Sequence, residues 1–193
     1  MARRRFEFRP DKAGSSFFSR LIPTKKQRAK LLKWGLYTLL LLLLSLLQDV
    51  VLCKVRILGA TTDLVPCAIM LICLLEGAQK SSIFCLVASM LYVAAGTAPG
   101  YYVLPIITII AMSVTMFRQG YLSRSFGTVL ACLAVSVIVY EMVIFGMEFF
   151  SGRTLLSRIN AFWLKAALSL AAAPMIYPFA AAIEKIGGET WME

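Results

Sequence analysis

Six long apolar segments, separated by short polar breaks, run through this chain and leave it few possible folds. About 20 consecutive apolar residues are needed for a helix to cross the roughly 30 Å hydrocarbon layer of a bilayer. The first segment is the clearest, since residues 39–44 form an unbroken run of leucine. The pattern predicts an all-α integral membrane protein with about six transmembrane helices, at residues 34–53, 63–75, 83–95, 102–117, 126–147 and 162–183.

The second and third of these segments are shorter than a full span. The second reaches spanning length only if its flanking residues Thr61, Thr62, Glu76 and Gly77 are counted with it. Short apolar helices of this kind can be tilted or packed inside a bundle. A five-span arrangement is the alternative, but the lengths of the segments favour six.

Composition excludes several other classes of protein. Hydrophobic residues make up 60% of the 193 positions and charged residues 16%, whereas soluble domains have about 45–50% and about 25%. The chain has no histidine, which removes Ser/His/Asp triads and HExxH zinc sites. Its five cysteines show no CxxC spacing, and the four inside apolar segments are expected to act as small hydrophobic residues, whereas Cys53 could face an oxidising side. We expect no catalytic residue, no metal, no cofactor and no nucleic-acid partner, and an intramembrane enzyme is the least favoured interpretation.

Basic residues are concentrated before the first apolar segment. Residues 1–33 hold eleven of the twenty Lys and Arg residues, and such segments stay on the cytoplasmic side of a membrane. With the N-terminus inside, fifteen basic residues lie on the cytoplasmic side and four on the outer side. We therefore expect a basic cytoplasmic tail (1–33), a six-helix transmembrane domain (34–183) and a short cytoplasmic C-terminal tail (184–193).

Part of this basic tail is a candidate for contact with anionic lipid at the inner leaflet. Each basic residue near a charged leaflet contributes about 1 kcal/mol to binding. The alternative is an ordinary positively charged anchor with no specific lipid target. The candidate residues are Arg20, Lys25, Lys26, Arg28, Lys30 and Lys33.

Two ionisable residues lie inside predicted spans, where charge is costly and therefore points to a role. Glu141 lies about two turns before the outer end of the fifth segment, and Lys165 lies one to two turns after the start of the sixth. Because consecutive helices are usually neighbours, we predict an ion pair between them, direct or through water. Such a pair can fix the register of two helices. The other interpretation is a polar site for a partner protein or ligand.

Three further polar residues lie at predicted helix ends. Gln48 and Asp49 close the first segment, and Asp63 opens the second, where a carboxylate suits the positive end of a helix. We expect Asp63 to cap its helix and Asp49 to pair with Lys54 or Arg56. All three are candidate contacts for a partner. The two aspartates could also belong to an aspartyl protease, but no GxGD motif is present.

Several motifs of the chain resemble those of a known family. They are Leu47-Gln48, then Gly59-Ala60-Thr61-Thr62-Asp63-Leu64-Val65-Pro66, then Glu76-Gly77, and finally the turn Gly96-Thr97-Ala98-Pro99-Gly100 before a span that begins near Tyr101. Over roughly residues 35–120 the chain resembles the rod shape-determining protein MreD family. An acidic residue often found late in the third helix of such proteins is replaced here near Tyr92 and Val93.

The resemblance implies a non-enzymatic scaffold of the bacterial cell-elongation machinery in the cytoplasmic membrane. Such a protein helps to maintain rod shape and to position peptidoglycan synthesis through contacts with MreC-like and other membrane proteins. The implied fold is similar to that of the substrate-binding subunits of energy-coupling-factor transporters. This gives the alternative function, a vitamin-binding transporter subunit whose polar pocket would use Gln48, Asp49, Glu141 and Lys165.

Overall fold

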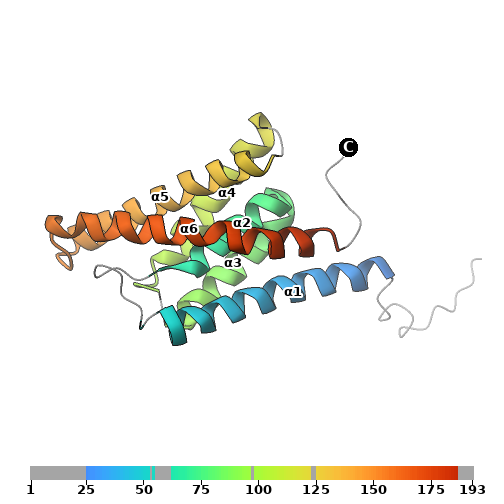
Figure 1. The fold of residues 1–193 in the computed structure, drawn as a ribbon, viewed down its shortest axis with the longest axis horizontal. Helices are drawn as coiled ribbons and strands as arrows, with labels where there is room; N and C mark the ends of the chain where they lie inside the picture. Colours follow the sequence, from blue (N-terminus) through green and yellow to red (C-terminus); the bar gives the residue numbers. More distant parts are fainter. Residues whose placement is uncertain (1–24, 53, 55–61, 97, 123–124, 187–193) are drawn as a thin grey trace, which may run out of the picture.

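A computed structural model of the chain describes residues 25–52, 54, 62–96, 98–122 and 125–186 (Figure 1). Within these residues the regular structure is entirely helical. The helices are α1 (Lys25–Leu47), which continues as the π-helix η2 (Gln48–Leu52), α2 (Leu64–Glu76), α3 (Ala78–Ala94), α4 (Val103–Tyr121), α5 (Phe126–Phe150), the short 3₁₀-helix η3 (Leu156–Arg158) and α6 (Ile159–Glu184).

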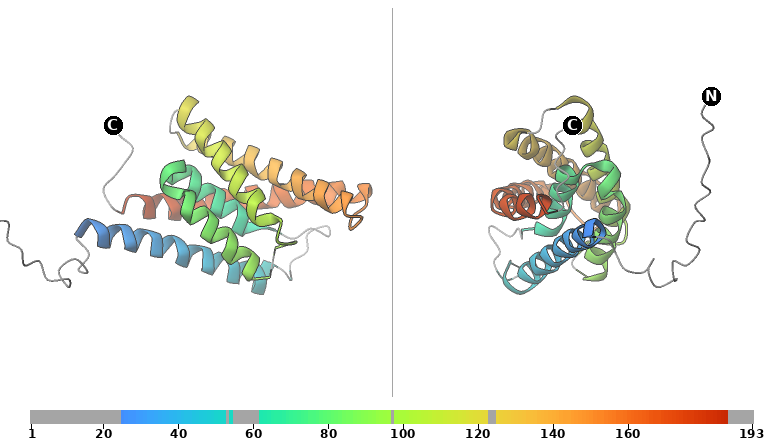
Figure 2. Two further views of the ribbon diagram at one scale, coloured as in Figure 1. Left: turned by 180° about the vertical axis from the view of Figure 1, so that it is seen from behind. Right: turned by 90° about the vertical axis from the view of Figure 1, so that its right-hand side faces the viewer.

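Successive helices run in alternating directions along the long axis of the bundle (Figures 1 and 2). As a result, α1 begins and α6 ends at the same end of the molecule, which we call the Lys33 end. The opposite end, where α1 gives way to η2 and α2 begins, is called the Asp63 end. A hydrogen bond between α1 and α6 fixes this arrangement, because the Tyr37 hydroxyl lies 3.3 Å from the carbonyl oxygen of Ala180.

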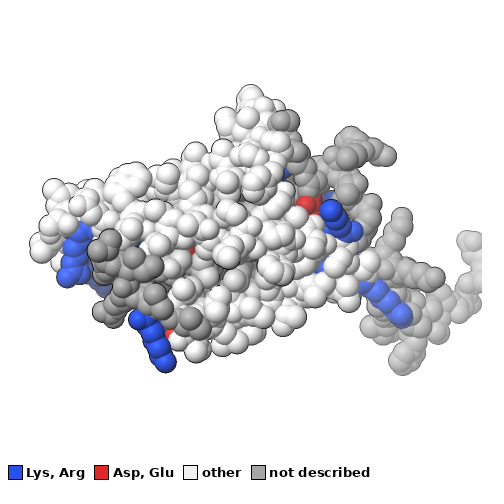
Figure 3. Space-filling view, in the orientation of Figure 1, with Lys and Arg blue, Asp and Glu red and all other residues white. Residues whose placement is uncertain are grey.

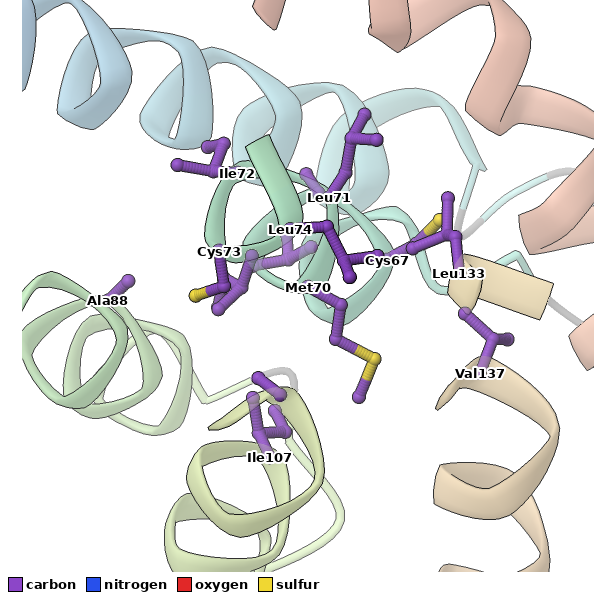
Figure 4. Close-up of a cluster of buried hydrophobic side chains, with 14 of the residues drawn as sticks. Cys67, Met70, Leu71, Ile72, Cys73, Leu74, Ala88, Ile107, Leu133 and Val137 are labelled. Carbon is purple, nitrogen blue, oxygen red and sulfur yellow. The ribbon is translucent and has the colours of Figure 1, made fainter. Parts of the chain in front are cut away.

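The core of the bundle is built around α2. All 13 residues of this helix are buried, and it packs against each of the other five long helices. Figure 4 shows its side chains pointing in several directions, towards Ala88 of α3, Ile107 of α4, and Leu133 and Val137 of α5. A helix that is apolar on every face can be surrounded on every side by protein or by lipid, and here the other helices surround it. This explains how the second apolar segment is accommodated in spite of its length.

A sharp reversal joins α2 to α3. Gly77 alone connects the two helices and has a φ of 86°, in the left-handed region that suits glycine. Its N–H donates to the carbonyl of Cys73, and its own carbonyl accepts from the N–H and the hydroxyl of Ser81. The reversal therefore satisfies backbone groups at the end of one helix and the start of the next.

In the part of the chain that the structure describes, four helices are long and apolar enough to cross a membrane: Arg28–Val50, Val103–Tyr121, Phe126–Phe150 and Leu156–Glu184. The helices Leu64–Glu76 and Ala78–Ala94 are apolar but shorter. On the face shown in Figure 3, Lys and Arg lie at the two ends of the molecule and the long middle is nearly uncharged. These features are those of an all-α membrane protein.

The helix boundaries differ from the predicted ones mainly where polar residues continue a helix. The first helix begins at Lys25 and not near residue 34, so Lys30 and Lys33 belong to its first turns. The fourth continues to Tyr121 and includes Arg118. Lys, Arg and Gln are good helix formers, so a helix need not end where its hydropathy falls.

Candidate functional site

A buried cluster of polar side chains surrounds the start of α2. At its centre is the carboxylate of Asp63, a residue with only 4% of its surface exposed. Lys165 Nζ of α6 lies 3.0 Å from Asp63 Oδ2, and the Tyr92 hydroxyl of α3 lies 3.0 and 2.9 Å from the two carboxylate oxygens. Gln48 Nε2 donates to Asp63 Oδ1 over 3.1 Å. Three segments far apart in the sequence thus bind one carboxylate.

The cap of α2 comes from Gln48 and not from Asp63. Asp63 occupies the N-cap position, but its side chain makes no capping hydrogen bond. Instead, Gln48 Oε1 accepts from the N–H groups of Leu64 and Val65, at 2.9 and 3.2 Å. The expectation that Asp63 caps its own helix is therefore wrong. The carboxylate of Asp63 pairs with the ammonium of Lys165. The amide oxygen of Gln48 accepts from the N–H groups at the start of α2, which have no partner within the helix.

The ion pair expected between Glu141 and Lys165 is present in the structure, but Lys165 has a second partner. Its Nζ lies 3.2 Å from Glu141 Oε1 and 3.0 Å from Asp63 Oδ2. One ammonium therefore serves two carboxylates. Glu141 is 3% exposed, and its second oxygen, Oε2, has no hydrogen-bond partner. The buried hydroxyl of Tyr140, the preceding residue, is also without one.

Ser169, one turn after Lys165 on α6, ties the cluster to the backbone. Its hydroxyl accepts from the N–H of Asp63 over 3.0 Å, and its carbonyl accepts from the thiol of Cys67 over 3.6 Å. Sequence reasoning did not identify Ser169 or Tyr92 as members of the site. The only sign of their role in the sequence is that each places a hydroxyl group inside an apolar segment.

The remaining predicted site residues lie elsewhere. Asp49 is exposed beside the cluster and takes no part in it. Of its two suggested partners, Lys54 is exposed and makes no ion pair with Asp49 within the described residues, and Arg56 lies outside them, as does Arg20. The side chains of Lys25 and Lys26 are likewise not described, whereas Arg28 and Lys30 are exposed on the first turns of α1.

Lys33 departs from its expected role in lipid contact, because it points into the bundle. Its Nζ lies 2.7 Å from Glu76 Oε1, and the Tyr37 hydroxyl lies 2.7 Å from the same oxygen. This second cluster is at the end of α2. There the negative end of the helix disfavours a carboxylate, and the basic residue offsets it. Arg118 brings a second positive charge to the end of α2, where it donates to the carbonyl of Leu74.

A hollow between α1 and α3, here called the α1–α3 groove, has a volume of about 340 Å³. Val65 of α2 and Tyr92 of α3 are among the residues that line it. Towards the Lys33 end, the rings of Trp34 and Phe84, 5.0 Å apart, close the space between the two helices. The other lining residues are Thr38, Leu41, Leu42, Ser45, Ala88, Leu91, Ala94 and Ala95.

These contacts favour a structural role for most of the cluster. Asp63, Gln48, Tyr92 and Ser169 use their polar atoms on one another and on the first turn of α2. Buried polar networks that are fully satisfied hold helices in one register. Among the described residues, no group of acids and cysteines is arranged to hold a metal ion.

Comparison of the chain with protein-family models, with curated proteins and with solved structures finds no match.

Proposed function

We propose that the chain is a non-enzymatic scaffold of the bacterial cell-elongation machinery. In this role it helps to maintain rod shape and positions peptidoglycan synthesis through contacts with MreC-like and other membrane proteins. The proposal starts from the resemblance of its motifs to those of the MreD family. It places the chain in the cytoplasmic membrane with both ends in the cytoplasm.

The observation that carries the proposal is that two of the motifs meet in space. Gln48, from the first motif, binds Asp63, from the second, and caps the helix that Asp63 opens. The polar residues that could have recognised a substrate are used to hold this junction together. A chain whose buried polar side chains bind one another is suited to presenting a fixed surface to other proteins.

The arrangement of the helices supports the proposed orientation and fold. Alternating helices bring Lys25, the first residue of α1, and Glu184, the last residue of α6, to one end of the bundle. The basic residues before and on the first turns of α1 favour the cytoplasm for that side. The proposal counts six transmembrane helices arranged as in the substrate-binding subunits of energy-coupling-factor transporters, with α2 and α3 as a short buried hairpin.

Affinity purification of the full chain from its own cells, after crosslinking and in mild detergent, tests this function. We expect recovery of an MreC-like protein, one with a single span and a coiled coil outside the membrane. The matched control is a double variant of the buried cluster, Gln48→Ala with Tyr92→Phe, which should lose the partner if the cluster sets the shape of the binding surface. Recovery of no elongation protein from the crosslinked unmodified chain would contradict the proposal.

A vitamin-binding transporter subunit is the second candidate, favoured by one observation. The α1–α3 groove, at about 340 Å³, is within the range of small-molecule sites, about 300–1,000 Å³. Mass spectrometry of the denatured, purified protein distinguishes the two functions. A stoichiometric released vitamin supports the transporter subunit, whereas its absence together with recovery of an MreC-like protein supports the scaffold.

A further inference from the structure

The charges in the cluster at the Asp63 end do not balance. Among the residues that the structure describes, two carboxylates, those of Asp63 and Glu141, face one ammonium, that of Lys165. If both acids were ionised, the cluster would carry one net negative charge among buried side chains. Removing an ion from water costs several kcal/mol unless it is paired, and a group in this position commonly becomes neutral instead.

The two acids differ in how well they are supported as anions. Asp63 receives Lys165, Tyr92 and Gln48, and it lies at the positive end of α2. Glu141 receives Lys165 alone, and its Oε2 is buried without a hydrogen-bond donor. A carboxylate oxygen without a donor costs more in a dry site than a neutral hydroxyl there. The proton that would balance the cluster therefore belongs on Glu141.

We infer that Glu141 is a proton-binding site, which takes up one proton from water on Oε2 and makes the cluster neutral inside the membrane. Oε1 of the neutral carboxyl group still accepts from Lys165. The groups that face Glu141 or its neighbour Tyr140 come from every side of the cluster: Asp63 before α2, Tyr92 on α3, Tyr102 before α4, Glu148 on α5 and Lys165 on α6.

The carboxyl group of Glu141 is enclosed by the fold. A small cleft of about 10 Å³ between α5 and α6, lined by Glu141, Met142, Trp163, Ile138, Phe162 and Ala166, exposes only apolar surface. A water molecule would have no polar partner there. An ionised Oε2 would therefore lack a hydrogen bond, which favours the neutral carboxyl group.

Infrared spectroscopy of the full chain in lipid vesicles tests this inference, because a protonated carboxyl group has a carbonyl band well separated from the carboxylate bands. At neutral pH we expect this band in the unmodified protein and its loss in Glu141→Gln. The matched control Glu148→Gln, on the same helix, should retain it. Identical spectra of the unmodified protein and Glu141→Gln in this region would overturn the inference.

The imbalance of charge also predicts the infrared spectrum of a second variant. In Asp63→Asn, only one carboxylate remains opposite Lys165, so Glu141 should ionise and the band should disappear at neutral pH. If the band persists in this variant, Glu141 is neutral for another reason and the charge argument fails. If it is lost in Asp63→Asn but kept in Glu141→Gln, the proton is on Asp63 and the assignment is wrong.

Isotope labelling covers the case in which these variants do not fold. Glutamate labelled with ¹³C in its carboxyl group shifts the band of a protonated glutamate and leaves that of an aspartate in place. We expect a label-sensitive band in the unmodified chain, and in Glu141→Asp a band that the label does not move. No label-sensitive band in the unmodified chain overturns the inference.

Discussion

Gln48 caps the helix that Asp63 opens, and the two side chains are also joined directly by a hydrogen bond of 3.1 Å. Fifteen positions separate them in the sequence. An amide side chain can do both tasks at once, since it donates through Nε2 and accepts through Oε1. This contact joins the end of α1 to the start of the central helix.

Replacing Gln48 with alanine should therefore destabilise the protein by about 1–2 kcal/mol, the cost of a lost helix cap. Thermal unfolding in neutral detergent, followed by circular dichroism, measures the change. Asp49→Ala is the matched control, because Asp49 is adjacent and exposed. Equal effects of the two substitutions would show that Gln48 does not cap α2.

Lys165→Met should be the most destabilising single change in the cluster, because it leaves the buried carboxylate of Asp63 without a cation. Breaking a buried ion pair costs about 3–5 kcal/mol. Adding Asp63→Asn removes the stranded charge, so the double variant should be more stable than Lys165→Met alone. Unfolding in a mixed-detergent titration compares the two, and a double variant that is less stable than the single one would contradict the shared ion pair.

Tyr92→Phe removes one donor from Asp63 and leaves the ring in place. Hydrogen bonds to charged groups contribute about 1.5–3 kcal/mol, and the variant should lose stability in this range. Tyr101→Phe is the control, since Tyr101 is 88% exposed. A loss of stability in the control as large as that in Tyr92→Phe would mean that the hydroxyl of Tyr92 is not specifically bound.

At the other end of α2, Lys33 and Lys30 should respond differently to truncation. Lys33→Ala leaves the buried carboxylate of Glu76 without its cation and should lower stability by about 1–3 kcal/mol in detergent without lipid, the cost of a lost partner of a buried polar group. Lys30→Ala should have no effect there, because Lys30 is exposed. Equal melting temperatures for the two variants would argue that Lys33 does not pair with Glu76.

Gly77→Ala should destabilise the α2–α3 reversal by about 1 kcal/mol or more, because alanine is strained at a φ of 86°. Gly146→Ala should have the opposite sign, since Gly146 lies inside α5 with open space around the added methyl group. Thermal unfolding of both variants checks this, and stabilisation by Gly77→Ala would disprove the strained turn.

How much of the site could be predicted depended on which helices bring its residues together. Glu141 and Lys165 lie on consecutive helices at matching depth, so helix length and adjacency were enough to place them side by side. Lys165 and Asp63 lie on helices that are not consecutive, and their contact depends on α2 being at the centre of the bundle. Nothing in the hydropathy of residues 63–75 distinguishes a central helix from a short peripheral one.

Tyr92 and Ser169 were harder still to predict. Tyrosine and serine are common in membrane helices for reasons of packing, and neither carries a charge that demands a partner. The cap from Gln48 was also beyond sequence reasoning, because local rules assign a cap to the preceding aspartate. In the structure the carboxylate of Asp63 pairs with Lys165, and the distant residue Gln48 caps α2 instead.

The shortness of α2 imposes an order on how the protein is made. Its 13 residues span about 20 Å, less than the hydrocarbon layer, so both acidic ends of the helix must find cations within the fold. Glu76 meets Lys33, which leaves the ribosome before it. Lys165, the partner of Asp63, is synthesised about a hundred residues after it. The buried cluster can therefore form only after α6, the last helix, has been made.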